Sequence, residues 1–123
     1  MPPSTAHDPA TESQVPMNPR DFLILFSLVD QESHGYGLVK EVERQSEGEV
    51  RLDPANLYRS LKRMIRQGLV EESDRRPAPD SHDERRRYYA ITGFGRRVVT
   101  REAARIDKLA AAARARNLVP ESE

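Results

Sequence analysis

The sequence predicts a mainly α domain of the α+β class, in which three short helices and a hairpin precede one long helix. Apolar residues recur at three- and four-residue steps over residues 18–29, 36–46 and 53–66, as they do in helices that bury one face. Residues 85–91, RRRYYAI, are rich in aromatic and β-favouring side chains that alternate between two faces. Residues 93–117 again have a helical pattern, with a stripe longer than a small domain can cover. This order indicates a winged helix-turn-helix with a long C-terminal dimerisation helix.

Composition limits the class of protein. With 123 residues, of which 37% are apolar, the chain can build one core but not two. It contains no cysteine, which excludes disulfides and thiolate metal sites and fits a reducing compartment. No apolar run approaches the ~20 residues that span a bilayer, and the N-terminus lacks a secretory signal pattern. We therefore expect a cytoplasmic protein with no membrane partner.

The net charge of zero hides an asymmetry along the chain. Residues 1–50 hold three cations against nine carboxylates, a balance of −6, whereas residues 51–117 hold seventeen cations against nine carboxylates, a balance of +8. A polyanion is attracted to the second part and repelled by the first.

The chain begins with a segment that has little to bury. Residues 1–17 contain four prolines among Ser, Thr and acidic residues, and we expect them to form a disordered leader. The first helix starts after it, with Asn18 as the N-cap and proline in the first turn. Its apolar residues exceed a single stripe, so a second copy of the chain is expected to cover part of it, around Phe22 and Phe26.

The segment between the first and third helices forms the next part of the motif. His34–Gly37 interrupts the pattern, and a second amphipathic helix follows it to about Ser46. Val50–Leu52 could make a brief strand. The third helix starts sharply, with Asp53 as the N-cap and a proline after it, and Gly68 ends it.

The third helix has two unlike faces. Leu57, Leu61 and Met64 lie on one stripe that must face a core. No carboxylate occurs between positions 54 and 70. The opposite arc and its edge collect the polar and cationic residues Asn56, Arg59, Ser60, Lys62, Arg63 and Arg66. A short capped helix with this outer face has the shape and charge that enter a DNA major groove. The alternative is an ordinary solvated face, although such faces usually mix charges of both signs.

The hairpin after the third helix carries its own basic cluster. Polar and proline-rich residues 71–84 separate Val70 from the strand at residues 85–91, so the two strands and their loop resemble a wing. Five arginines at the strand ends and loop could reach a phosphate backbone: Arg75, Arg76, Arg85, Arg86 and Arg87. The alternative is a solvated hairpin whose arginines pair with the nearby carboxylates.

The last helix is expected to run from Gly93 to about Asn117, with Thr92 as its cap and residues 118–123 as a flexible tail. A second copy is the natural cover for its stripe. Glu102 lies inside this stripe and either pairs with Arg101 or Arg105, which we favour, or makes a polar contact at a dimer seam. The expected dimerisation residues on this helix are Val98, Val99, Glu102, Ile106, Leu109 and Ala113.

These patterns assign roles to the basic surface. We expect Asn56, Arg59 and Arg63 to contact base edges, because arginine pairs with guanine and asparagine with adenine. Lys62, Arg66, Tyr36, Tyr58 and the five wing arginines are expected to contact phosphates. Tyr58 borders the apolar stripe, so it is either a core residue or a phosphate contact.

An enzyme is not expected. The three histidines, His7, His34 and His82, are scattered, and there is no cysteine nucleophile. We therefore predict no catalytic residues, no metal and no cofactor. The remaining rival is a protein-interaction module that keeps the same fold but presents its basic face to an acidic protein.

Three stretches together resemble the PadR-type transcriptional regulators. They are HGYGL at residues 34–38, LYRSLKRM and QGLV within residues 54–70, and RRRYYAITGFGRR at residues 85–97, and the match covers about residues 18–110. The resemblance implies a winged helix-turn-helix, a homodimer joined through the first and last helices, and repression at a palindromic operator. The single C-terminal helix is similar to that of the smaller subfamily.

Two departures from the family pattern bear on specificity. The family often has Pro-Gly-Thr-Leu-Tyr where this chain has Pro54, Ala55, Asn56, Leu57 and Tyr58, so an amide replaces a threonine near the DNA. Some small members bind flat hydrophobic drugs between tryptophans, and this chain has no tryptophan. Release by a small-molecule effector is a family expectation, and the sequence does not identify the molecule.

Overall fold

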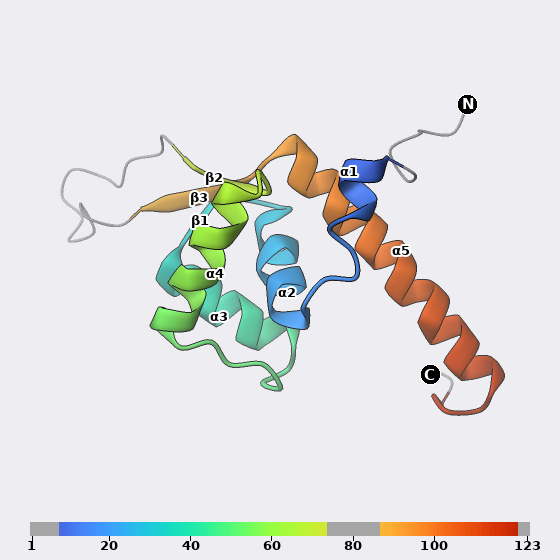
Figure 1. The fold of residues 1–123 in the computed structure, drawn as a ribbon. Coiled ribbons are helices and arrows are strands. Elements are labelled where there is room, and N and C mark those ends of the chain that lie inside the picture. The colour runs from blue at the N-terminus through green and yellow to red at the C-terminus, as the bar shows by residue number, and fades with distance from the viewer. Residues whose placement is uncertain (1–7, 74–86, 121–123) are drawn as a thin grey trace.

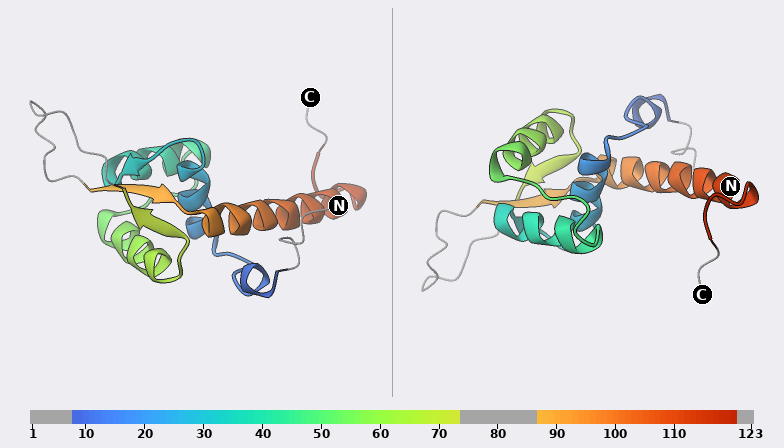
Figure 2. Two further views of the ribbon diagram at one scale, coloured as in Figure 1. Left: turned by 90° about the horizontal axis from the view of Figure 1, so that it is seen from above. Right: turned by 90° about the horizontal axis from the view of Figure 1, so that it is seen from below.

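The fold is a small helical domain with a three-stranded sheet, from which one long helix projects (Figures 1 and 2). The computed structural model describes residues 8–73 and 87–120. Its elements are α1 (Pro9–Glu12), α2 (Pro19–Leu28), β1 (Ser33–His34), α3 (Gly35–Gln45), α4 (Pro54–Arg66), β2 (Val70–Glu72), β3 (Tyr88–Ile91) and α5 (Gly93–Ala115). This is the predicted winged helix-turn-helix with a long C-terminal helix. No helix within these described residues is long and apolar enough to cross a membrane.

The predicted caps set the starts of the helices. The Asn18 side chain accepts a hydrogen bond from the Arg20 amide at 2.8 Å, and Thr92 Oγ1 accepts one from the Gly95 amide at 2.9 Å. Both satisfy N–H groups that a first helical turn leaves without partners. Gly68 ends α4 with a φ of +78°, a conformation that glycine adopts without steric cost.

The sheet contains the strand predicted at residues 85–91, as β3, but not the one predicted at Val50–Leu52. β3 lies in the centre, with β1 and β2 antiparallel on either side, and Ser33 pairs with Tyr89 while Val70 pairs with Ile91. The prediction of a strand at Val50–Leu52 is wrong. This segment is irregular, and the Val50 amide donates instead to Ser46 Oγ at 2.9 Å. The first strand has only two residues, too few to leave a periodic signal in the sequence.

The core lies where α2, α3, α4 and the sheet meet the first turns of α5. Gly95 allows this close approach, because a Cβ there would collide with the Leu69 carbonyl oxygen and lie 2.8 Å from Ile91 Cγ1. The buried apolar side chains are Ile24, Leu25, Leu28, Leu38, Val42, Leu52, Leu57, Leu61, Met64, Leu69, Val70, Tyr89, Val98 and Val99. The apolar stripe predicted for α4 therefore faces the interior, which leaves its opposite arc for solvent.

The N-terminal segment is ordered where a disordered leader was expected. Residues 1–7 of that leader lie outside the described residues, but residues 8–17 form α1 and a connection that contacts α5 (Figure 1). Arg101 Nε donates to Glu12 Oε1 at 2.7 Å, and Thr11 is fully buried. The Met17 amide donates to Glu102 Oε2 at 3.1 Å. These partners are more than 80 residues away in sequence, so local composition could not indicate them.

Glu102 and its neighbours are part of the protomer's own interior. Glu102 is only 1% exposed, and Arg105 donates to both of its carboxylate oxygens, at 2.7 and 2.6 Å. These hydrogen bonds outweigh the opposing effect of burial and, together with the Met17 amide, lower the pKa of Glu102. Of the two arginines predicted as partners, Arg101 and Arg105, it is Arg105 that forms these hydrogen bonds. Because Val98, Val99 and Glu102 are covered by their own chain, the structure removes these three from the expected dimer seam.

Candidate nucleic-acid interface

The outer arc of α4 is exposed, cationic and free of carboxylates. At about 100° per residue, Arg59, Lys62 and Arg66 lie opposite the buried stripe, and all three are exposed. The helix is 13 residues long and has no acidic residue from its first to its last turn. This arc presents only positive charge to an incoming ligand, which suits a polyanion.

The start of α4 holds a connected group of polar side chains. The N-cap Asp53 accepts from the Asn56 amide at 2.9 Å and from Asn56 Nδ2 at 2.6 Å. Arg59 Nη2 in turn donates to Asn56 Oδ1. The guanidinium of Arg59 is therefore steadied at the N-terminal end of the helix, which is the end that recognition helices place against base edges.

Two residues predicted to contact DNA differ in their surroundings from the exposed cations of α4. Ser60 is 7% exposed and lies in the interior beside Leu57 and Leu61, because it falls on the core side of the helix. Arg63 is half-buried at the flank of α4, where Nη2 forms an ion pair with Asp21 Oδ2 in the first turn of α2. We therefore remove Ser60 from the interface, whereas the DNA contact of Arg63, whose side chain is 42% exposed, stays a prediction.

The exposure of Tyr58, on α4, decides whether it is a core residue or a surface residue. Its side chain is 50% exposed, so it is a surface residue and not a core residue. Its hydroxyl end lies over α3, since a Cβ added at Gly35 would be 2.5 Å from that oxygen. Tyr36 is also exposed, and the Lys40 ammonium lies 5.1 Å from the centre of its ring.

Lys40 is a candidate phosphate contact that the sequence analysis missed. It lies one helical turn after Tyr36 on α3, the helix that crosses the DNA backbone in this motif. The sequence feature that could have identified it is its spacing of four residues from Tyr36, which places both side chains on one face of the helix. A lone lysine in the acidic half of the chain did not stand out by charge.

The wing is described only at its base. Arg87 is exposed and donates to Glu72 Oε1 at 2.8 Å, across the two strands. The remaining predicted wing residues, Arg75, Arg76, Arg85 and Arg86, lie outside the described residues.

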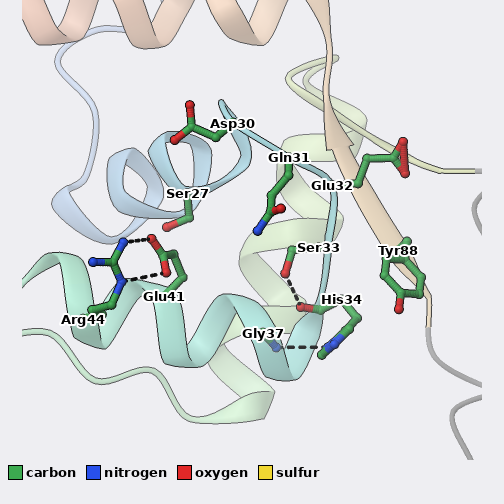
Figure 3. A pocket seen from close by; sticks show the side chains of 10 residues that line it. All are labelled: Ser27, Asp30, Gln31, Glu32, Ser33, His34, Gly37, Glu41, Arg44 and Tyr88. Atoms are coloured by element: carbon green, nitrogen blue, oxygen red, sulfur yellow. Dashed lines mark hydrogen bonds and ion pairs between the residues drawn. The ribbon is translucent and has the colours of Figure 1, made fainter. Parts of the chain in front are cut away.

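A polar hollow of about 580 Å³ lies between the end of α2, β1 and α3 (Figure 3). Asp30, Glu32 and Glu41 contribute carboxylates, and Arg44 is paired with Glu41 at 2.6 Å. The hydrogen bond from Arg44 lowers the pKa of Glu41, which keeps this carboxylate charged. Three carboxylates against one arginine make the hollow a poor match for phosphate.

His34 caps a helix at the edge of the same hollow. Its Nδ1 accepts the Gly37 amide at 3.0 Å, at the start of α3 (Figure 3). It therefore serves as the N-cap of this helix.

Comparisons with known proteins agree with this geometry. The family model described as the transcriptional regulator PadR-like family matches residues 24–101. A PadR family transcription regulator from Clostridium difficile R20291 is similar in structure, with a TM-score of 0.66, 23% identity, and coverage of 79% of this chain and 96% of that chain. A PadR-like regulator from Bacillus cereus gives a TM-score of 0.65 and 19% identity, over 81% of this chain and 92% of that chain.

A third solved structure contains nucleic acid. Bacillus subtilis PadR, in complex with operator DNA, has a TM-score of 0.57 and 19% identity, over 69% of this chain and 45% of that chain. No curated protein matches the chain significantly. At these identities the solved structures establish the fold, whereas the family model spans more than half of the sequence. The chain therefore belongs to the PadR-like family of DNA-binding transcriptional regulators, whose members are not enzymes.

Proposed function

We propose that the chain acts as a homodimeric repressor that binds a palindromic operator in double-stranded DNA. The observation that carries this proposal is the outer arc of α4, where Arg59, Lys62 and Arg66 are exposed and no carboxylate is present. The similarity to Bacillus subtilis PadR, which was solved in complex with operator DNA, supports DNA as the ligand.

Each side chain of the interface has a chemical role in the proposal. Arg59 and Asn56, at the N-terminal end of α4, contact base edges in the major groove. Lys62 and Arg66 contact phosphates beside them and set the register of the protein on the duplex. Further phosphate contacts come from Tyr36, Tyr58 and Lys40 and from the wing arginines Arg75, Arg76, Arg85, Arg86 and Arg87.

Exposed apolar side chains support the homodimer. Phe26 is 42% exposed and stacks on Phe22 at 5.8 Å between ring centroids, on a flank of α2 that its own chain covers only in part. On α5, Ile106 and Leu109 are exposed along the part that projects from the domain (Figure 2). Together with Ala113, these residues form the proposed seam. A two-fold axis through it predicts half-sites about 10 base pairs apart, or a simple multiple of that spacing.

A mobility-shift titration with the DNA upstream of the protein's own gene tests the proposal. The wild-type protein should retard this fragment, and Arg59→Glu should abolish the shift while the protein remains a dimer in light scattering. Arg114→Glu is the matched control, because it makes the same charge change at an exposed position near the end of α5. If no DNA is retarded, the rival module that binds an acidic protein is favoured.

Release by a small-molecule effector also belongs to the proposal, as it does for the family that the sequence resembles. The chain has no tryptophan, so a flat molecule cannot be held between tryptophans at the seam. Because the regulator acts on chromosomal DNA, it works inside the cell.

A further inference from the structure

The ion pair between Arg63 and Asp21 joins α4, the helix proposed to face DNA, to α2. The two residues are 42 positions apart in sequence, and the Arg63 guanidinium donates to the Asp21 carboxylate. The Asp21 side chain is only 15% exposed, whereas the Arg63 side chain is 42% exposed. The pair is thus partly shielded from water, whereas the pair between Arg87 and Glu72 at the base of the wing is exposed.

Arg63 lies at the edge of the arc of exposed cations. Its position is about 40° around the helix from Arg59 and about 60° from Arg66, on the flank of α4 that faces α2. Asp21 neutralises much of the charge of Arg63 and occupies its Nη2, so the guanidinium attracts a phosphate less than a cation without a carboxylate partner does.

Asp21 has a further connection, toward the proposed dimer seam. It precedes Phe22, which stacks on the exposed Phe26 along α2. The ion pair therefore ties α4 to the helix whose apolar flank meets the second copy in the proposed dimer. A change in this tie would alter how the two α4 helices are spaced on DNA.

We propose that Arg63 is a positioning residue, which holds α4 at its docking angle by pairing with Asp21, and that it does not itself contact DNA. This inference rests on the proposed function. It deepens that function by separating the arginine that orients the recognition helix from the arginines that bind.

The direction in which one substitution changes operator affinity distinguishes a positioning role of Arg63 from direct contact with DNA. Asp21→Asn removes a negative charge, and that change alone should strengthen binding to a polyanion. It also frees Arg63, so binding should strengthen further if Arg63 contacts DNA. If the ion pair positions α4, the same substitution weakens binding, by about fivefold for a partly shielded pair.

The experiment measures operator affinity and its salt dependence for a set of variants. Asp21→Asn should weaken binding about fivefold, whereas the matched control Asp30→Asn, which removes an exposed carboxylate just after the same helix, should not. Arg63→Ala should weaken binding without changing the slope of log affinity against log salt. The charge swap Asp21→Arg with Arg63→Asp should restore affinity toward that of the wild type.

Two results of the binding experiment would overturn the inference: tighter binding by Asp21→Asn, or a slope reduced by about 1.8 in Arg63→Ala, which is the loss of two phosphate contacts per dimer. Amide hydrogen exchange gives a test that needs no DNA. Exchange in α4 should be faster in Asp21→Asn than in Asp30→Asn, and equal rates would also overturn the inference. A wild-type protein that binds no DNA but shows this exchange difference would refute the proposed function and leave the structural tie supported.

Discussion

Removing Arg66 from both protomers should reduce the salt dependence of operator binding by about a quarter. About four phosphate contacts per protomer are expected from the cations of the proposed interface, and Arg66 makes one of them. A dimer that uses all of them neutralises about eight phosphates. Since each phosphate contact contributes roughly −0.9 to the slope of log affinity against log salt, the wild-type slope should be about −7.

Arg66→Ala removes two of these contacts in the dimer, so its slope should be about −5. Fluorescence anisotropy with a labelled operator, at salt concentrations between roughly 50 and 200 mM, measures both slopes. Arg114→Ala is the control, because it removes an exposed cation near the end of α5 and should leave the slope at its wild-type value. The reasoning is refuted by a wild-type slope near zero or by equal slopes for the wild type and Arg66→Ala.

Three further predictions concern the fold and the assembly. Glu102→Gln should lower the free energy of unfolding by about 1–2 kcal/mol at pH 7 in urea titrations, because it weakens charged hydrogen bonds to the partly exposed Arg105. The folded protein lowers the pKa of Glu102, so this contribution is present above about pH 4.5 and is lost as the pH falls through the lowered pKa; a variant with the same acid dependence as the wild type would contradict this account. Gly95→Ala should destabilise by at least ~2 kcal/mol because of the collision with Leu69, whereas Gly93→Ala, where the nearest atom is 3.9 Å away, should cost much less; equal thermal stabilities would refute the close approach. Leu109→Glu should shift the dimer toward monomer in analytical ultracentrifugation, and Ala104→Glu, on the opposite face of α5, should not; a Leu109→Glu protein that remains fully dimeric would exclude this seam.

Local chemistry was enough to predict the helices and the exposed arc of α4. Asn18, Asp53 and Thr92 were identified as caps because an N-cap acts within three residues of itself. The stripe of Leu57, Leu61 and Met64 fixed which side of α4 is buried, and therefore which side carries its cations, since helical periodicity relates neighbouring turns.

Contacts between distant parts of the chain decided the rest. Periodicity could not show that Arg63 meets Asp21, or that Glu102 is covered by Arg105 together with the Met17 amide of an N-terminal segment that looked disordered. The strand at Ser33–His34 exists because β3 pairs with it, and two residues carry no pattern of their own. Residues close together in the sequence thus determine where helices begin and which of their faces are apolar. The partners of a half-buried charge depend instead on which elements fold against each other.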